Sequence, residues 1–544
     1  MAHSDRSWLG KVAFVALVGL VGCREGASGG SAAAGSRAEP ASSSFGREAP
    51  TVPSGGVAPS SSFLISFSDG VIPANAGDLI SSAGGTLAAR YPAVGAILAR
   101  ASSATFATTV RATAGVEAVG AIEAAHSRIE LPLLHAGADR RPRPPGRMPP
   151  SPTSSGSGDP LSFRQWDMDQ IHALEARAVS SGKKAVLVGV VDSGIDVTHP
   201  DLAGQVDAAA SASCVGGVPN TAPAAWASDV IGHGTHVAGT IAASKNGVGI
   251  IGVAPGVRLA AVKVAVDDGD DPSFGLVLPD AFVCAVDWAI AHDFDLINAS
   301  LTIDPFTAPI DDIFCSDEPD RAAVVSIVRR AVLAAARNKV TIVAASGNFF
   351  TDLASLTDID GSHPEGQCRV LPVQLPPVIG VSAVGYTQAL SFYSNYGSGA
   401  IDLAGPGGDS LIPDPLVTDT LASGQVLASV PAGSLYYAAA AEYDGQVQDC
   451  ASGTTGTCAT YAYLQGVSQA VPHVTGVAAL VLSRTGKLAP DALLAKLSQS
   501  ATALPCPPSP YDPGGWGQPA TCDGPPAHNN FYGAGEIDAL AAVR

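Results

Sequence analysis

Three short stretches, far apart in the chain, contain side chains suited to nucleophilic and acid–base chemistry. Asp192 follows an apolar run, His233 lies in a Gly-His-Gly-Thr-His stretch, and Ser468 precedes a long apolar helical pattern. Taken singly they have simpler interpretations: a turn aspartate, half of a His233–His236 metal pair, and a helix N-cap serine. Taken together, such groups activate an oxygen nucleophile, because the histidine accepts the serine proton and the aspartate orients the histidine.

The elements around these residues alternate between strands and helices. Apolar runs typical of buried strands occur at 185–191, 259–266, 296–299 and 340–345, and helical patterns between them include 282–291 and 322–337. This alternation predicts an α/β fold, a doubly wound, mainly parallel sheet with helices on both faces. Active sites of such folds lie at the carboxyl ends of the strands, which is where Asp192 is expected.

The sequence around all three residues is similar to that of a known enzyme family. Residues 192–196, 232–240 and 466–474 are Asp-Ser-Gly-Ile-Asp, Gly-His-Gly-Thr-His-Val-Ala-Gly-Thr and Gly-Val-Ser-Gln-Ala-Val-Pro-His-Val. In this order they resemble the signature blocks of the subtilisin-like serine proteases (subtilases), and the resemblance extends from about Trp166 to the C-terminus. It implies a subtilisin-like fold and an endopeptidase that hydrolyses peptide bonds through an acyl-enzyme.

The resemblance implies a role for each residue. Ser468 would be the nucleophile, His233 would take and return its proton, and Asp192 would hold the imidazole in the correct tautomer. The Ala-Ala-Ser-Gly-Asn segment at 344–348 looks like the family's oxyanion block. The Asn348 side-chain amide and the Ser468 backbone N–H would then donate hydrogen bonds to the oxyanion.

Two segments resemble the edges along which the family binds an extended peptide, whose main chain adds as a strand. They comprise Ser300, Leu301 and Thr302 on one side and Ala345, Ser346 and Gly347 on the other. The family usually has Gly at the position of Thr302, so this threonine is expected to narrow the primary specificity pocket against large aromatic side chains. It usually has Met at the position of Gln469, so an oxidisable thioether is missing beside the nucleophile.

A structural calcium ion is a further implication of the resemblance. Asp201 and the loop 245–250 after the His233 helix look like the family's calcium site, with Asp201 and Asn246 at ligand positions. Carboxylate and carbonyl oxygens suit this cation. The alternative is an ordinary loop between a helix and a strand.

The N-terminal region is predicted to direct export and membrane anchoring. Residues 1–22 carry positive charge and then an apolar run too short to span a membrane, which is typical of a signal peptide. The run ends in Leu-Val-Gly-Cys, which resembles a bacterial lipoprotein signal and implies a lipid on Cys23. Residues 23–60 form a low-complexity tether, and residues 128–160 form a basic, Pro-rich linker.

Residues 61–127 show a β-α-β-β-α-β pattern between the tether and the linker. Gly84-Gly85, Tyr91 and residues 115–119 resemble the subtilase propeptide, which assists folding and inhibits the enzyme. Cleavage between about 128 and 162 would separate the peptidase domain, residues 161–544, from the lipid anchor. It would release the mature protease to the periplasm or the extracellular space. The implied partners are a protein or peptide substrate, the chain's own propeptide as inhibitor, and the lipid anchor.

Composition excludes other classes of protein. The chain is 46% hydrophobic and 15% charged, which is too apolar for a disordered protein. Its formal net charge of −19 argues against nucleic acid as a partner, because phosphate binding needs clustered Lys and Arg. An even number of cysteines remains after Cys23, which suggests disulfides in an exported chain. Short loops could be closed by the pairs Cys450–Cys458 and Cys506–Cys522.

Two other functions remain open for the same residues. One is a catalytically silent peptide-binding lipoprotein on the subtilase fold, and the other is a serine hydrolase that acts on esters. The peptide-binding edge at 300–302 favours peptides over esters. The segments 304–320 and 409–465 look longer than the family core requires, and we expect them to rim the cleft and restrict access.

Overall fold

The computed structural model describes residues 61–122, 128–130, 158–267, 274–303, 314–315, 319–356, 368–418, 420–450, 458–515 and 517–544. The predicted signal peptide, Cys23, the tether and most of the linker lie outside these residues. In the part of the chain that is described, no helix combines the length and the apolarity needed to cross a membrane.

A parallel sheet forms the centre of the structure. Its seven strands have the order β16-β15-β13-β11-β6-β8-β7, and all neighbours run parallel. They are β6 (Leu187–Asp192), β7 (Ala212–Ser213), β8 (Arg258–Lys263), β11 (Leu296–Ala299), β13 (Thr341–Ala345), β15 (Ile379–Val384) and β16 (Leu403–Pro406). The winding reverses between β6 and β11. The predicted α/β fold is therefore confirmed, and the reversal makes the carboxyl ends of these two strands the expected place of a binding crevice.

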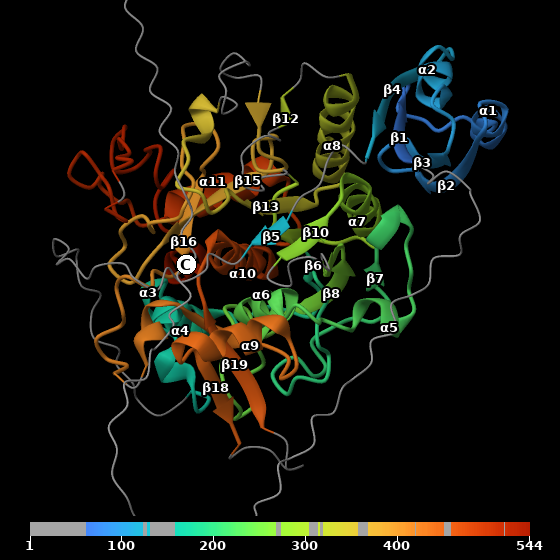
Figure 1. Cartoon of the computed structure of the whole chain (residues 1–544). Helices are drawn as coiled ribbons and strands as arrows, with labels where there is room; N and C mark the ends of the chain where they lie inside the picture. Colours follow the sequence, from blue (N-terminus) through green and yellow to red (C-terminus); the bar gives the residue numbers. More distant parts are fainter. Residues whose placement is uncertain are drawn as a thin grey trace, which may run out of the picture. The chain divides into compact units, whose positions relative to one another are not determined.

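Helices cover both faces of this sheet (Figure 1). Helices α6 (His233–Ala242) and α10 (Val467–Thr485) share one apolar core, and α7 (Pro279–Ala291) and α8 (Pro319–Arg337) share the other. Small residues let α10 lie deep in its core, because a Cβ atom added at Gly476 would be only 2.6 Å from Val253 Cβ. Other helices in this part of the chain include α3 (Trp166–Gln170), α4 (Ala173–Val179), α5 (Pro223–Trp226), α11 (Pro490–Ser500) and α12 (Ala539–Val543).

The first described unit is a small antiparallel sheet with two helices. Its elements are β1 (Ser61–Phe67), α1 (Ala76–Ser82), β2 (Gly85–Tyr91), β3 (Ala96–Ala101), α2 (Phe106–Arg111) and β4 (Val116–Ala121), with sheet order β2-β3-β1-β4. This is the predicted β-α-β-β-α-β sequence of elements. Successive residues of a strand face opposite sides of a sheet. Phe63 and Ile65 accordingly lie in the unit's own core, whereas Leu64 joins the core that contains α7 and α8.

Polar contacts also join this small unit to the rest of the fold. Arg330 on α8 pairs with Glu117 and donates a hydrogen bond to the carbonyl of Phe67. The Tyr91 hydroxyl donates to the carbonyl of Gly217 at 2.6 Å. The unit is thus held against α8 by charged as well as apolar contacts.

The residues that follow this unit form a strand and not the start of an exposed linker. Strand β5 (Arg128–Glu130) pairs antiparallel with β10 (Phe274–Val277), which also pairs with β9 (Ala265–Asp267). The sequence placed residues 128–130 in the linker because no local pattern shows that a distant strand edge offers them backbone partners.

The segment 409–465, predicted to be longer than the family core requires, contains its own small sheet. Strands β17 (Val426–Ser429), β18 (Gln446–Asp449) and β19 (Ala459–Leu464) pair antiparallel, and helix α9 (Leu435–Ala440) lies between β17 and β18 in the sequence. A further two-stranded ladder joins β12 (Phe314–Cys315) to β14 (Cys368–Arg369). Of the segment 304–320, residues 304–313 and 316–318 lie outside the described residues.

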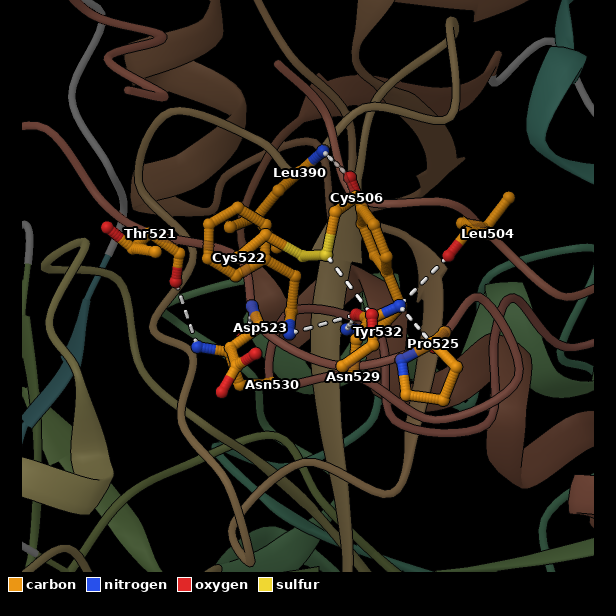
Figure 2. Close-up of a disulfide and its surroundings, with 12 residues drawn as sticks. Leu390, Leu504, Cys506, Thr521, Cys522, Asp523, Pro525, Asn529, Asn530 and Tyr532 are labelled. Atoms are coloured by element: carbon orange, nitrogen blue, oxygen red, sulfur yellow. Dashed lines mark hydrogen bonds between the residues drawn. A yellow bond between two sulfur atoms is a disulfide. The ribbon is translucent and has the colours of Figure 1, made fainter. Parts of the chain in front are cut away.

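Disulfides connect segments that are far apart as well as near neighbours. Cys214 is bonded to Cys284, and both short-loop pairs proposed from the sequence, Cys450–Cys458 and Cys506–Cys522, are present. Figure 2 shows the surroundings of Cys506–Cys522. There the Asn529 side chain donates a hydrogen bond to the Leu504 carbonyl, and the Leu390 N–H donates to the Tyr532 hydroxyl. The first bond holds the C-terminal segment together, and the second connects it to the chain between β15 and β16.

The buried carboxyl group of Glu536 connects helix α3 to the segment just before α12. The Gln170 and Gln388 side-chain amides each donate to Glu536 at 2.6 Å. Burial raises the pKa of Glu536 from 4.5 to about 7. The folded protein therefore holds a proton between these values that the unfolded chain releases.

The Glu536 carboxyl makes stability depend on pH. Its contribution is fully present below the unfolded pKa and is lost as the pH rises through about 7. We expect Glu536→Gln to raise the unfolding temperature by a few degrees at pH 8 and to have little effect at pH 5. Thermal unfolding of both proteins at the two pH values tests this. An equal shift at both values would contradict the assigned cause.

Candidate active site

The three residues proposed from the sequence lie on elements that border the expected crevice, although their contacts differ. Asp192 is the last residue of β6, His233 is the first of α6, and Ser468 is the second of α10. The crevice is the one at which the winding of the sheet reverses. Residues separated by 41 positions, Asp192 and His233, come into direct contact there.

Asp192 and His233 form a buried hydrogen-bonded pair. The two carboxylate oxygens lie 2.8 and 3.0 Å from Nδ1 of His233, and both side chains are fully buried. A carboxylate only accepts hydrogen bonds, so the Nδ1 proton is fixed on this side of the ring. The buried Nε2 has no hydrogen-bond partner. That nitrogen is therefore the free basic atom of the pair.

A second buried carboxylate, Asp229, holds the helix that begins with His233. One oxygen accepts from the Ser193 hydroxyl and the Gly232 N–H, each at 2.8 Å. The other accepts from the N–H and the hydroxyl of Thr235 at 2.8 and 2.6 Å. These bonds satisfy N–H groups at the start of α6, which have no partner within the helix. Sequence analysis missed Asp229, although an acidic residue shortly before a helix is a typical capping signal.

Ser468 contacts Ser300 and not His233. Its hydroxyl donates to the Ser300 carbonyl at 3.0 Å, and the Ser300 hydroxyl donates to the Ser468 carbonyl at 2.8 Å. Asn298 donates to the Ser300 hydroxyl at 2.9 Å and accepts from Thr475 at 2.8 Å. This network fastens the start of α10 to the end of β11. Catalytic hydrogen bonds often form only with substrate bound, so the missing contact to His233 Nε2 does not disqualify Ser468 as the nucleophile.

Asn348 lies beside the start of α10, as expected for an oxyanion donor. Its Oδ1 accepts from the Val467 N–H at 2.8 Å, which assigns the orientation of the amide and leaves Nδ2 as the donor. The first N–H groups of a helix also lack partners within it and form the positive end of its dipole. The crevice thus offers donors suited to a negatively charged oxygen next to Ser468.

The two predicted peptide-binding segments face each other. Leu301 is buried, whereas Thr302 is partly exposed, and its methyl group lies 3.9 Å from where a Cβ atom at Gly347 would be. Ala345 ends β13, and the Ser346 carbonyl accepts from the Asn395 side chain at 2.8 Å. The threonine methyl therefore occupies part of the space between the segments, and the narrowing of a specificity pocket stays a prediction.

The His233–His236 metal pair is wrong. His236 Nε2 lies 3.2 Å from each of the Val426 and Ala462 carbonyls, while His233 faces Asp192. Burial lowers the pKa of His236 to about 3, so this ring is neutral. No group of three or more His, Cys, Asp or Glu side chains is arranged for a metal within the described ranges.

Asp201 lies beside the loop that resembles a calcium site. One of its oxygens accepts from the Tyr461 hydroxyl at 2.9 Å and from the Ile250 N–H at 3.4 Å. The other, Oδ1, is buried without a hydrogen-bond partner, and burial raises the pKa of Asp201 to about 7. The side-chain oxygen of Asn246, Oδ1, accepts a hydrogen bond from the Val248 N–H at 2.8 Å. An unpartnered carboxylate oxygen beside this loop fits a hard cation that takes oxygen ligands.

A second Asp–His pair, which sequence analysis also missed, supports the helix of Ser468. His473 Nε2 lies 2.9 Å from an oxygen of Asp167, and Nδ1 lies 2.8 Å from the carbonyl of Gln469. Both partners accept hydrogen bonds, and both ring and carboxylate are fully buried. The pair connects α10 to α3.

Comparison with known proteins agrees with this arrangement. Residues 183–535 match the sequence profile of the subtilase family. Fervidolysin from Fervidobacterium pennivorans is 29% identical over 339 residues, which cover 61% of this chain and 39% of fervidolysin. Subtilisin DY from Bacillus licheniformis is 29% identical over 319 residues, which cover 59% of this chain and 84% of that protein. The match therefore spans well under half of fervidolysin and most of subtilisin DY.

Solved structures show the same fold. The epidermin leader peptide processing serine protease of Staphylococcus aureus aligns with a TM-score of 0.62 at 18% identity. The alignment covers 89% of this chain and 98% of that one. Because the matched profile covers more than half of the sequence, the chain belongs to the subtilase family of subtilisin-like serine proteases.

Proposed function

We propose that this protein is an exported serine endopeptidase made as an inhibited precursor, with Ser468, His233 and Asp192 as its catalytic residues. The observation that carries the proposal is the buried Asp192–His233 pair, in which the carboxylate holds Nδ1 and leaves Nε2 without a hydrogen-bond partner. Export and lipidation at Cys23 belong to the proposal and rest on the sequence alone.

The proposed reaction uses groups whose contacts are described above. The Ser468 hydroxyl turns from the Ser300 carbonyl to His233 Nε2, gives up its proton and attacks the substrate carbonyl carbon. Asn348 Nδ2 and the Ser468 N–H donate to the resulting oxyanion. His233 then passes the proton to the leaving amine, and water releases the acyl group by the same steps in reverse. Asp192 stabilises the imidazolium throughout.

Inhibition of the precursor is supported by strand β5. The Val264 N–H, between β8 and β9, donates to the Asp192 carbonyl at 2.8 Å, so β9 begins at the active-site end of the sheet. Strand β10 pairs with β9 on one edge and with β5 on the other. A peptide substrate that adds to a sheet edge would compete with β5 for β10. The chain's own residues 128–130 thus act as an inhibitory strand until cleavage.

Self-processing tests the nucleophile and the precursor together. Residues 24–544 would be produced as wild type and as Ser468→Ala, and intact masses followed over time. We expect the wild type to split after Glu130 and before about residue 162, while Ser468→Ala stays whole. If both proteins stayed whole, the catalytically silent binding protein would be favoured. If both split at the same rate, self-processing would be excluded.

Active-site labelling tests the enzyme independently of processing. A serine-reactive fluorophosphonate should label the wild type and leave Ser468→Ala unlabelled, because the activated hydroxyl is the atom that reacts. A matched panel of peptide and simple ester substrates should show preference for peptides. Absence of labelling would contradict a serine enzyme, and hydrolysis of esters alone would favour the esterase alternative.

Subtilases commonly bind structural calcium, and we propose that Asp201 and Asn246 contribute to such a site here. The unpartnered Oδ1 of Asp201 supports this, because a cation beside it would favour the ionised carboxylate over the buried neutral form. The ion would stabilise the loop 245–250 and take no part in the reaction. The alternative remains a loop that is stable without metal.

Chelation of calcium tests the ligand assignment. We expect a chelator to lower the unfolding temperature of the Ser468→Ala protein, and Asp201→Asn to remove most of that effect. Asp402→Asn is the matched control, because Asp402 is a partly buried carboxyl whose pKa burial raises to about 6, but it contacts the Gly380 N–H instead of this loop. An unfolding temperature unaffected by the chelator would contradict the site.

A further inference from the structure

One aromatic contact at His233 takes no part in the mechanism above. The ring of Tyr436 meets the ring of His233 edge-to-face, with centroids 5.7 Å apart and planes at 88°. Tyr436 is the second residue of α9, in the segment 409–465, and it is fully buried. This contact places the Tyr436 ring directly beside the ring that is proposed to transfer the proton.

Helix α9 is fixed to the residues that lead into His233. The N–H groups of Leu435 and Tyr436 donate to the carbonyls of Val230 and Ile231 at 2.9 and 3.0 Å. A Cβ atom at Gly232 would be only 2.5 Å from the Ser434 hydroxyl oxygen, so a larger residue at 232 would collide with the Ser434 side chain just before α9. The position of the Tyr436 ring is therefore set by the backbone around His233.

Apolar packing supports the ring from behind. Tyr436 shares a buried cluster with Ile231, Val430 and Leu464, of which Leu464 ends β19 shortly before Ser468. Rotation of the ring away from His233 would require α9 to leave this cluster. The Tyr436 ring is therefore held in one position against His233.

The Tyr436 ring lies on the side of His233 where the leaving group of a substrate is expected. The acyl half of a substrate is expected along residues 300–302 and β10, where β5 now pairs. Helix α9 instead contacts β19, and Figure 1 shows α9 and β19 on one side of α6 with β10 and β5 on the other. His233 delivers its proton to the leaving amine, so the residue after the scissile bond must lie near the ring that Tyr436 covers.

We propose that Tyr436 is a specificity-determining residue, which restricts the residue directly after the scissile bond to small side chains such as Gly, Ala and Ser. The inference rests on the proposed function and adds the substrate class to it: peptides with a small residue on the leaving-group side. A bulky side chain there would collide with a ring that packing prevents from moving.

Acyl transfer measures this subsite directly. A peptide ester first acylates Ser468. An added amino acid amide then competes with water: its nitrogen attacks the acyl carbon, the bond to Ser468 Oγ breaks, and the amine proton passes through His233 Nε2 to Oγ. This is peptide cleavage in reverse, so the amide occupies the leaving-group subsite. The ratio of peptide product to hydrolysed acid reports how well each amide fits.

The comparison uses glycinamide and leucinamide with processed wild-type protein and three variants. We expect the wild type to prefer glycinamide at least ten-fold, and Tyr436→Ala to lower that preference at least ten-fold. Tyr436→Phe keeps the ring and should keep the preference. Tyr437→Ala is the matched control, because this neighbouring buried tyrosine accepts a hydrogen bond from Gln448, whereas the ring contact with His233 is made by Tyr436.

Three results would overturn the inference. Equal use of both amides by the wild type would show that this subsite does not exclude bulky side chains, even if Tyr436→Ala failed to fold. An equal loss of preference in Tyr436→Ala and Tyr437→Ala would show that loosening of α9 is the cause. A preference kept by folded Tyr436→Ala would remove Tyr436 from the subsite. Failure of the wild type to form an acyl-enzyme would instead refute the proposed function, and the subsite with it.

Discussion

The buried hydrogen bond between Asp192 and His233 constrains the rest of the structure. Burying a carboxylate and an imidazole costs free energy unless their polar atoms form hydrogen bonds. The two side chains must therefore be positioned accurately relative to each other. Strand β6 must end at one partner and α6 must begin at the other. Asp229 then satisfies the first N–H groups of α6, and Gly232 allows α9 to approach the same turn. The base is thus held by its own strand, its own helix and a segment that enters the fold two hundred residues later.

Ser468, the proposed nucleophile, is held by different contacts from those that hold Asp192 and His233. Ser468 is connected to β11 through Ser300, and α10 is connected to β13 through Asn348 and Val467. The parallel sheet keeps these two groups of contacts in register, because β6, β11 and β13 are adjacent strands. The two hydrogen bonds between Ser468 and Ser300 fix the backbone that carries the serine hydroxyl.

The remaining elements act on access to this crevice. The N-terminal unit packs against α8 and places β5 on the edge strand β10, on the acyl side of the proposed cleft. Helix α9 places Tyr436 on the other side, against His233. Backbone hydrogen bonds hold both elements in place. Strand β5 pairs with β10, and the first residues of α9 donate to the carbonyls of Val230 and Ile231. One is removed by cleavage in the proposed maturation, whereas the other remains in the mature protein.

The sequence alone determined the features that depend on local pattern. Periodicity placed strand 296–299 at its observed bounds and predicted the order of elements in residues 61–121, and three short blocks led to the proposal of Asp192, His233 and Ser468 as catalytic residues. The tertiary structure alone decided which distant groups meet. His236 faces carbonyls 190 and 226 positions away, Ser468 donates to Ser300, residues 128–130 pair with β10, and Tyr436 packs on His233. A local pattern reports burial and periodicity, whereas such contacts depend on strand register, side-chain rotation and the packing of segments brought together only by folding.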